Sequence, residues 1–169
     1  MHGGARLSSL PEEGNSSRAA PVLLLLSLVT ATVVVAGCAR AVPVQAAPSA
    51  TEVGCAEVMV RLPDALGDRQ RRETTGQSTA AWGRPQEQVT LRCGADPLPP
   101  TTDPCVSVDG VDWVLRQAGG SDRATTYTSY GREPAVELTL EGENPSGADL
   151  VLADLSAAVA VLASARACS

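Results

Sequence analysis

The sequence predicts an α+β domain: an N-terminal and a C-terminal helix on one face of an antiparallel sheet of about five or six strands. Apolar residues recur with helical spacing near Cys55 and again beyond Ser146, and between these segments they alternate with polar residues as in strands. Packing both helices on one face would bury both apolar stripes. Four cysteines in the same part of the chain indicate that disulfides staple the fold.

Residues 1–37 predict a signal peptide of the lipoprotein type. A polar start is followed by an uncharged apolar stretch over residues 19–37, which is the pattern of a secretory signal. Residues 35–38, Val-Ala-Gly-Cys, resemble a bacterial lipobox, so Cys38 is predicted to carry a diacylglyceryl group at the mature N-terminus. An uncleaved helix stays open as an alternative, because these nineteen residues at ~1.5 Å each span about 28 Å.

The remainder divides into a tether and a domain. Residues 38–51 are predicted to be the lipidated cysteine and an extended tether, since residues 39–51 contain two prolines and no periodicity. A tether of this length reaches about 20–30 Å. Residues 52–169 are predicted to form a single globular domain. The predicted location is extracytoplasmic, in the cell envelope, anchored to the cell membrane.

The first part of the domain is predicted to hold one helix and two strands. Pro63 ends the helix, whose apolar face comprises Cys55, Val58, Met59 and Leu62. The polar stretch Leu66–Gln77 is predicted to be a solvated loop. Its Arg69, Arg71 and Arg72 could meet anionic lipid or a wall polymer, but three arginines beside two acids are usually just a soluble loop. Residues 79–82 and 88–93 are predicted strands around a Gly83-Arg84-Pro85 turn, because apolar and polar residues alternate in the second.

The second part is predicted to hold four strands and the closing helix. The clearest hairpin signal is the Asp109-Gly110 turn between alternating segments at 106–108 and 111–115. Residues 125–130 and 136–141 are further predicted strands. Ser146 and Asp149 have the spacing of a capping box, and the helix after them is predicted to run to about Arg166 on four apolar residues: Leu152, Leu155, Val159 and Leu162.

Four cysteines predict two disulfides, and three pairings are open. Cys93 and Cys105 flank a proline-rich loop, whereas Cys55 and Cys168 lie at the two ends of the domain, each at a predicted helix terminus. The favoured pairing is therefore Cys55–Cys168 with Cys93–Cys105. A metal site or a reactive thiol is the rival interpretation, but the chain has no Cys-x-x-Cys spacing.

Composition excludes several catalytic classes. The chain has no lysine, and its one histidine, His2, precedes the export signal. The mature domain therefore lacks the residues for a Ser-His-Asp triad, a P-loop lysine, a Schiff base or a histidine-ligated zinc. A formal net charge of −6 gives the whole domain no attraction to nucleic acid or to an anionic leaflet.

An ordered set of short motifs resembles a known family. The motifs are Ala81-Trp82-Gly83, Leu91-Arg92-Cys93-Gly94, Gly110-Val111-Asp112-Trp113, Tyr130-Gly131-Arg132 and Pro134-Ala135-Val136-Glu137. In this order they resemble an actinobacterial family of small exported proteins classed as a domain of unknown function. The similarity covers roughly residues 55–162. The resemblance implies an envelope location and supplies no catalytic residue.

Few side chains are candidates for a site. Arg92 and Arg132 could each bind a carboxylate of a ligand through paired hydrogen bonds, but Asp112 and Glu137 are available as internal partners. Trp113 could stack on a ligand, although core packing is the default in a chain without phenylalanine. Asp109 could pair with Asp112 for acid–base work, but an Asp-Gly dipeptide is typical of a tight turn.

These observations predict a membrane-anchored envelope lipoprotein with a non-enzymatic protein-interaction or structural role. The alternative is a binding module for a small ligand or cell-wall fragment that uses Arg92, Arg132 and Trp113, and the remote alternative is a carboxylate-based hydrolase. No metal and no cofactor are predicted. The expected partners are the membrane, through Cys38 or an uncleaved N-terminal helix, and an envelope protein; nucleic acid is not one.

Overall fold

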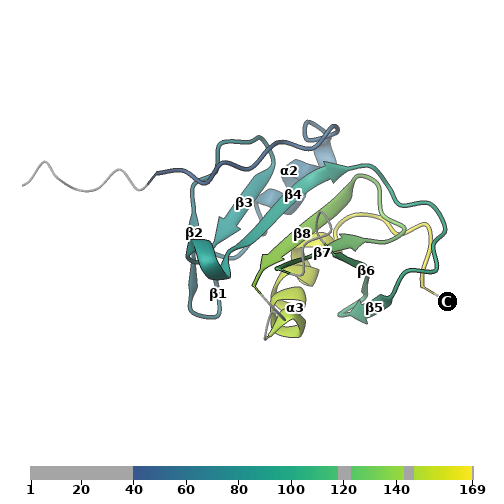
Figure 1. Cartoon of the computed structure of the whole chain (residues 1–169). Helices are drawn as coiled ribbons and strands as arrows, with labels where there is room; N and C mark the ends of the chain where they lie inside the picture. Colours follow the sequence, from purple (N-terminus) through teal and green to yellow (C-terminus); the bar gives the residue numbers. More distant parts are fainter. Residues whose placement is uncertain (1–39, 118–122, 143–146, 169) are drawn as a thin grey trace, which may run out of the picture. The chain divides into compact units, whose positions relative to one another are not determined.

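The computed structural model describes residues 40–117, 123–142 and 147–168, and it places them in one antiparallel sheet with two helices (Figure 1). The elements are α2 (Val53–Met59), β1 (Ala65–Leu66), β2 (Arg69–Arg72), β3 (Thr79–Trp82), the short 3₁₀ helix η1 (Pro85–Glu87), β4 (Val89–Ala95), β5 (Cys105–Val108), β6 (Val111–Gln117), β7 (Ala124–Ser129), β8 (Ala135–Glu141) and α3 (Ala148–Val159). The strand order is β1-β2-β3-β4-β8-β7-β6-β5. The α+β prediction is confirmed in outline, with eight strands in place of five or six.

The two additional strands, β1 and β2, occupy the stretch that the sequence predicts to be a loop. Leu66 pairs with Arg69 across a two-residue turn, and β2 continues onto β3 by pairing Arg71 with Trp82. The guanidinium carbon of Arg71 lies 6.0 Å from the centre of the Trp82 ring. An arginine stem can cover apolar surface while its charged end stays in water. This edge of the sheet therefore forms without the apolar alternation by which strands are recognised.

The predicted β5–β6 hairpin is confirmed. Val108 pairs directly with Val111, and the two intervening residues both have positive φ, 48° at Asp109 and 78° at Gly110. Such turns match the right-handed twist of paired strands. Asp109 is therefore fixed in the turn by backbone geometry.

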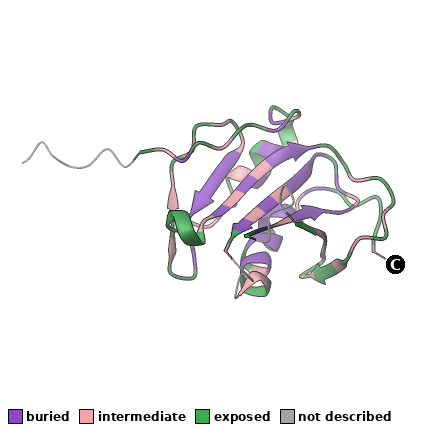
Figure 2. Ribbon diagram, in the orientation of Figure 1, coloured by how far each residue is buried: buried purple, intermediate pink, exposed green. Residues whose placement is uncertain are grey.

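Both helices cover the same face of the sheet. Leu91 of β4 and Leu138 of β8 are paired neighbours, and they share one buried core with Val58 of α2 and Leu155 of α3. Figure 2 shows the alternation of buried and partly exposed positions along the central strands. The opposite face carries polar residues at paired positions, such as Thr90 beside Thr139.

Both helices are shorter than predicted. The last helical residue of α2 is Met59, and that of α3 is Val159 in place of about Arg166. The N-cap of α3 is Gly147, with a φ of 82° and no side-chain cap hydrogen bond, and Ser146 of the predicted capping box lies outside the described residues. After α3 the chain turns back to the sheet, where the amide of Ala165 donates to the carbonyl of Gly131 at 2.7 Å.

The N-terminal segment is held on the fold, where the sequence predicts an extended tether up to residue 51. The amide of Val42 donates to the carbonyl of Glu73 at 2.8 Å, and that of Ser49 donates to Gly94 at 2.9 Å. Val42, together with Ala47 and Ala50, is buried. The segment is extended but not free, because small apolar residues between its prolines fit against the sheet.

The cysteines form two disulfide pairs, but not in the favoured pairing. Cys55 pairs with Cys93 and Cys105 with Cys168, with Cα–Cα distances of 5.5 and 6.4 Å. Cys93 faces the core beneath α2, and β4 and β5 are separated by three strands, so Cys93 and Cys105 lie too far apart to pair. Cys168 lies nine residues beyond the end of α3, on the segment that returns to the sheet.

No helix of the described ranges is long and apolar enough to cross a membrane. The predicted signal peptide and Cys38 lie outside those ranges.

Candidate functional site

Arg92 lies on the open face of the sheet and forms an ion pair within the protein. Its Nε donates to the carboxylate of Glu137, its register partner on β8. The pair lies at a surface hollow of about 400 Å³ whose other walls include Gln45 and Pro48 of the N-terminal segment and Asp96. Of the predicted ligand-binding residues, Arg92 thus lines one of the surface hollows described here.

Arg132 is a structural residue. Only 5% of it is exposed, and its guanidinium donates to the carbonyl of Leu162 and, at 2.8 Å, to that of Gly110. Burial lowers the pKa of Arg132, and the carboxylate of Asp112 partly offsets this effect. Its Nε has no hydrogen-bond partner among the described residues. Arg132 therefore joins the chain after α3 to the β5–β6 turn.

Trp113 is fully buried on the helix-covered face, where its indole nitrogen lies 3.4 Å from the hydroxyl oxygen of Ser156 in α3. Arg92 points to the opposite face of the sheet, so the structure does not bring Arg92, Arg132 and Trp113 together. A ligand cannot stack on Trp113 without displacing α3. Trp113 therefore packs in the core, as the sequence predicts by default for a tryptophan in a chain without phenylalanine.

The two carboxylates considered for hydrolysis have different surroundings. Asp109 is exposed in the hairpin turn. Asp112 accepts hydrogen bonds on both oxygens, from the hydroxyl of Ser107 and, at 2.7 Å, from the amide of Cys168. Neither lines any of the surface hollows described here. This geometry gives no support to a carboxylate-based hydrolase.

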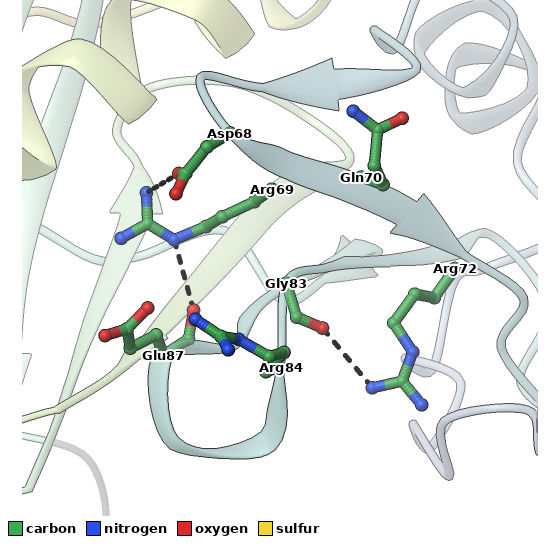
Figure 3. Close-up of a pocket in the computed structure, with 7 residues that line it drawn as sticks. All are labelled: Asp68, Arg69, Gln70, Arg72, Gly83, Arg84 and Glu87. Atoms are coloured by element: carbon green, nitrogen blue, oxygen red, sulfur yellow. Dashed lines mark hydrogen bonds and ion pairs between the residues drawn. The ribbon is translucent and has the colours of Figure 1, made fainter.

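A hollow of about 340 Å³ at the β1–β2 edge of the sheet is lined by several arginines (Figure 3). We call this the arginine hollow, and its residues are Asp68, Arg69, Gln70, Arg72, Gly83, Arg84 and Glu87. Arg69 donates to the carbonyl of Glu87 at 3.2 Å and lies 4.0 Å from the carboxylate of Asp68. Arg72 donates over longer distances, 3.4 Å to the carbonyl of Gly83 and 3.3 Å to that of Arg40.

Arg84 differs from the other arginines of this hollow because its exposed side chain makes no hydrogen bond or ion pair with the described residues. Figure 3 shows dashed contacts from Arg69 and Arg72 and none from Arg84. Most of the guanidinium hydrogen-bonding capacity of the hollow therefore remains available to an outside acceptor. The sequence predicts a solvated loop at residues 69–72, whose arginines could meet anionic lipid or a wall polymer, and a turn at Arg84. It does not predict that the fold brings these arginines to one hollow.

The described residues contain no group of three His, Cys, Asp or Glu side chains that could hold a metal ion. Among the carboxylates of the described residues, Asp103 is the one whose pKa is lowered, through hydrogen bonds from Arg116 and Thr101. Arg116 donates to it at 2.6 Å in an exposed ion pair. This arrangement serves the loop before β5 and has no feature of a catalytic dyad.

The family described as "Protein of unknown function (DUF3515)" matches residues 19–168. The chain matches no curated protein and no solved structure. The match confirms the resemblance to a domain of unknown function, whereas the actinobacterial origin and the motif set stay predictions. Since the match covers most of the chain, this protein belongs to the DUF3515 family of proteins of unknown function.

Proposed function

We propose that this protein is an exported lipoprotein, anchored to the outer surface of the cell membrane, whose domain acts as a non-enzymatic interaction or structural unit. The observation that carries the proposal is the start of the packed chain at Val42, four residues after Cys38. A lipid on Cys38 would therefore hold the domain directly at the membrane. The two disulfide pairs favour an oxidising compartment outside the cytoplasm.

Side-chain engagement supports a role other than catalysis. Arg92, Arg132 and Asp112 each have partners within the protein, and those partners belong to different strands or segments. Polar groups arranged in this way fix the fold and leave little freedom to transfer protons. The half-buried Arg69 and Arg72 and the exposed Arg84 at the β1–β2 edge are better suited to binding than to catalysis.

Intact mass spectrometry of the chain purified from membranes tests the anchor. We expect a mature protein that begins at Cys38 and carries the added mass of acyl chains. The variant Cys38→Ala should lose that mass and keep the N-terminal residues, whereas Ala39→Ser should be processed as the natural chain is. An unmodified chain that begins at Met1 would instead support the uncleaved helix.

A second candidate is a binding module for a small ligand or cell-wall fragment, and the hollow beside Arg92 favours it. Isothermal titration with muropeptides would test this role. Arg92→Gln should abolish the heat of binding, while Arg116→Gln, which also breaks an ion pair within the protein, should not. Equal binding by both variants would exclude the Arg92 hollow as the site.

A further inference from the structure

The arginine hollow lies where the N-terminal segment joins the sheet. Arg72 of the hollow donates to the carbonyl of Arg40, and two residues later the amide of Val42 donates to the carbonyl of Glu73. Arg40 itself is exposed. The part of the domain that a membrane anchor would reach first is therefore the β1–β2 edge.

The short chain between Cys38 and Val42 limits how far the β1–β2 edge can lie from the membrane. Four residues span at most about 14 Å when fully extended. The headgroup layer on one side of a bilayer is roughly 5–8 Å thick. If Cys38 carries lipid, as in the proposed function, the β1–β2 edge cannot leave the vicinity of the headgroups.

Charge is distributed unevenly between this edge and the rest of the molecule. Arg40 and residues 64–87 together hold five arginines and four carboxylates, whereas the other described residues hold six arginines and eleven carboxylates. The edge is thus slightly positive on a strongly acidic domain. An anionic surface would attract this edge and repel the remainder, which orients the domain.

We propose that the arginine hollow, with Arg40 beside it, is a docking surface for the phosphate headgroups of anionic membrane lipids. The proposal rests on the lipid anchor at Cys38. Guanidinium groups bind phosphate oxygens through paired hydrogen bonds. Arg84 has no competing partner among the described residues, and Arg72 makes only long contacts to carbonyl groups.

The acidic side chains of the edge do not prevent this contact. The carboxylate of Asp68 is 90% exposed and lies 4.0 Å from Arg69, so water screens it and the pair is weak. Arg69 reaches Glu87 through its backbone carbonyl. A phosphate group can therefore approach Arg69 and Arg84 without breaking a buried ion pair.

Hydrogen–deuterium exchange of the mature, lipidated chain in nanodiscs would test the docking. Nanodiscs of phosphatidylcholine alone are compared with nanodiscs that also contain phosphatidylglycerol. We expect slower exchange of residues 67–73 and 83–87 in the anionic discs only, and faster exchange again at high salt. Residues 105–117, at the opposite edge of the sheet, should exchange equally in both discs.

Paired variants separate local contact from net charge. Arg69→Gln/Arg84→Gln removes two arginines of the hollow and should lower the docked-to-undocked ratio about 30-fold. Arg116→Gln/Arg166→Gln removes the same charge from exposed positions outside the hollow and should change it by less than about twofold.

The outcomes distinguish the docking from the anchor on which it rests. The docking surface alone is overturned if an acylated chain exchanges at the same rate in both kinds of disc. It is also overturned if the docked-to-undocked ratio falls equally in both double variants. A chain without acyl mass on Cys38 overturns the anchor and the docking with it.

Discussion

Arg132 shows how one side chain joins distant segments of this protein. It donates to carbonyls of Leu162 and Gly110, although burial disfavours its charge. Arg132→Met should keep most of the packing and lose both hydrogen bonds. We expect the free energy of unfolding to fall by about 2 kcal/mol, since relief of the buried charge offsets part of the loss.

Urea denaturation with both disulfides intact measures this change. Arg116→Met serves as the control, because its ion pair with Asp103 is exposed and should contribute less than about 1 kcal/mol. Equal losses in the two variants would show that Arg132 has no special structural role.

Tyr127 couples the core to alkaline pH. Burial, and to a smaller extent the carboxylate of Asp149, raises the pKa of Tyr127 above the ordinary value of about 10. The stability that this shift represents is fully present below the pKa of the unfolded phenol, near 10, and is lost as pH rises through the higher folded value. Tyr127→Phe should therefore make stability fall less steeply above about pH 10.

Thermal unfolding of the two proteins from neutral pH to above pH 10 measures this difference. If Tyr127→Phe and the natural chain lose stability with the same slope, the buried phenol is not the group responsible.

At the scale of elements, strands with regular alternation could be predicted from sequence, and segments held by tertiary contacts could not. The β5–β6 hairpin follows from its Asp109-Gly110 turn and alternating valines. Strand β2 is an Arg-Gln-Arg-Arg segment without apolar alternation, and its Arg71 lies over the ring of its register partner Trp82 on β3. The arginine hollow could not be predicted for the same reason, because the pairing of β2 with β3 brings its two lining segments together.

Gly94 determines whether the N-terminal segment can stay on the sheet. Its φ is 102°, and a Cβ there would lie 2.3 Å from the carbonyl carbon of Ser49. Gly94→Ala should force the segment away and speed exchange of the Ser49 amide roughly tenfold or more, since overlaps of this kind cost about 1–3 kcal/mol.

Gly110→Ala is a matched control for that change. Gly110 also has positive φ, but a Cβ there would have no atom within 4 Å. It should cost about 1–2 kcal/mol of backbone strain and leave Ser49 exchange unchanged. Similar exchange at Ser49 in both variants would mean that backbone strain at a positive-φ glycine, and not contact with the N-terminal segment, explains the faster exchange.

For the whole molecule, both ends of the described chain are bound back onto the sheet. Residues 42–50 bond to the segment 73–78 before β3 and to Gly94 of β4, and the chain after α3 reaches β5 through Cys168. The number of disulfides could be predicted from the cysteine count, but the pairing could not, because it depends on where α3 ends and where the last residues return. Because α3 ends at Val159 and the chain then runs back to the sheet, Cys168 lies beside Cys105 of β5. Cys55 pairs instead with Cys93 of β4.

The two disulfides close loops of 38 and 63 residues, and in the chain-entropy treatment each contributes about 4 kcal/mol. They differ in access, since Cys55 and Cys93 are fully buried while Cys105 and Cys168 line a surface hollow with Tyr130. A thiolate must reach a sulfur atom to exchange with it. Dithiothreitol under native conditions should therefore open Cys105–Cys168 first and leave Cys55–Cys93 closed until the protein unfolds.

Timed alkylation followed by peptide mass spectrometry measures the order of reduction. The variant Cys105→Ser/Cys168→Ser should lack the early phase and keep the late one. Once Cys168 is released, no covalent bond supports the hydrogen bond from its backbone amide to Asp112. Amide exchange at Ala165 and Cys168 should therefore rise while the core strands stay protected. Labelling of all four cysteines at one rate would show that the molecule unfolds as a single unit and that the two disulfides are not reduced independently.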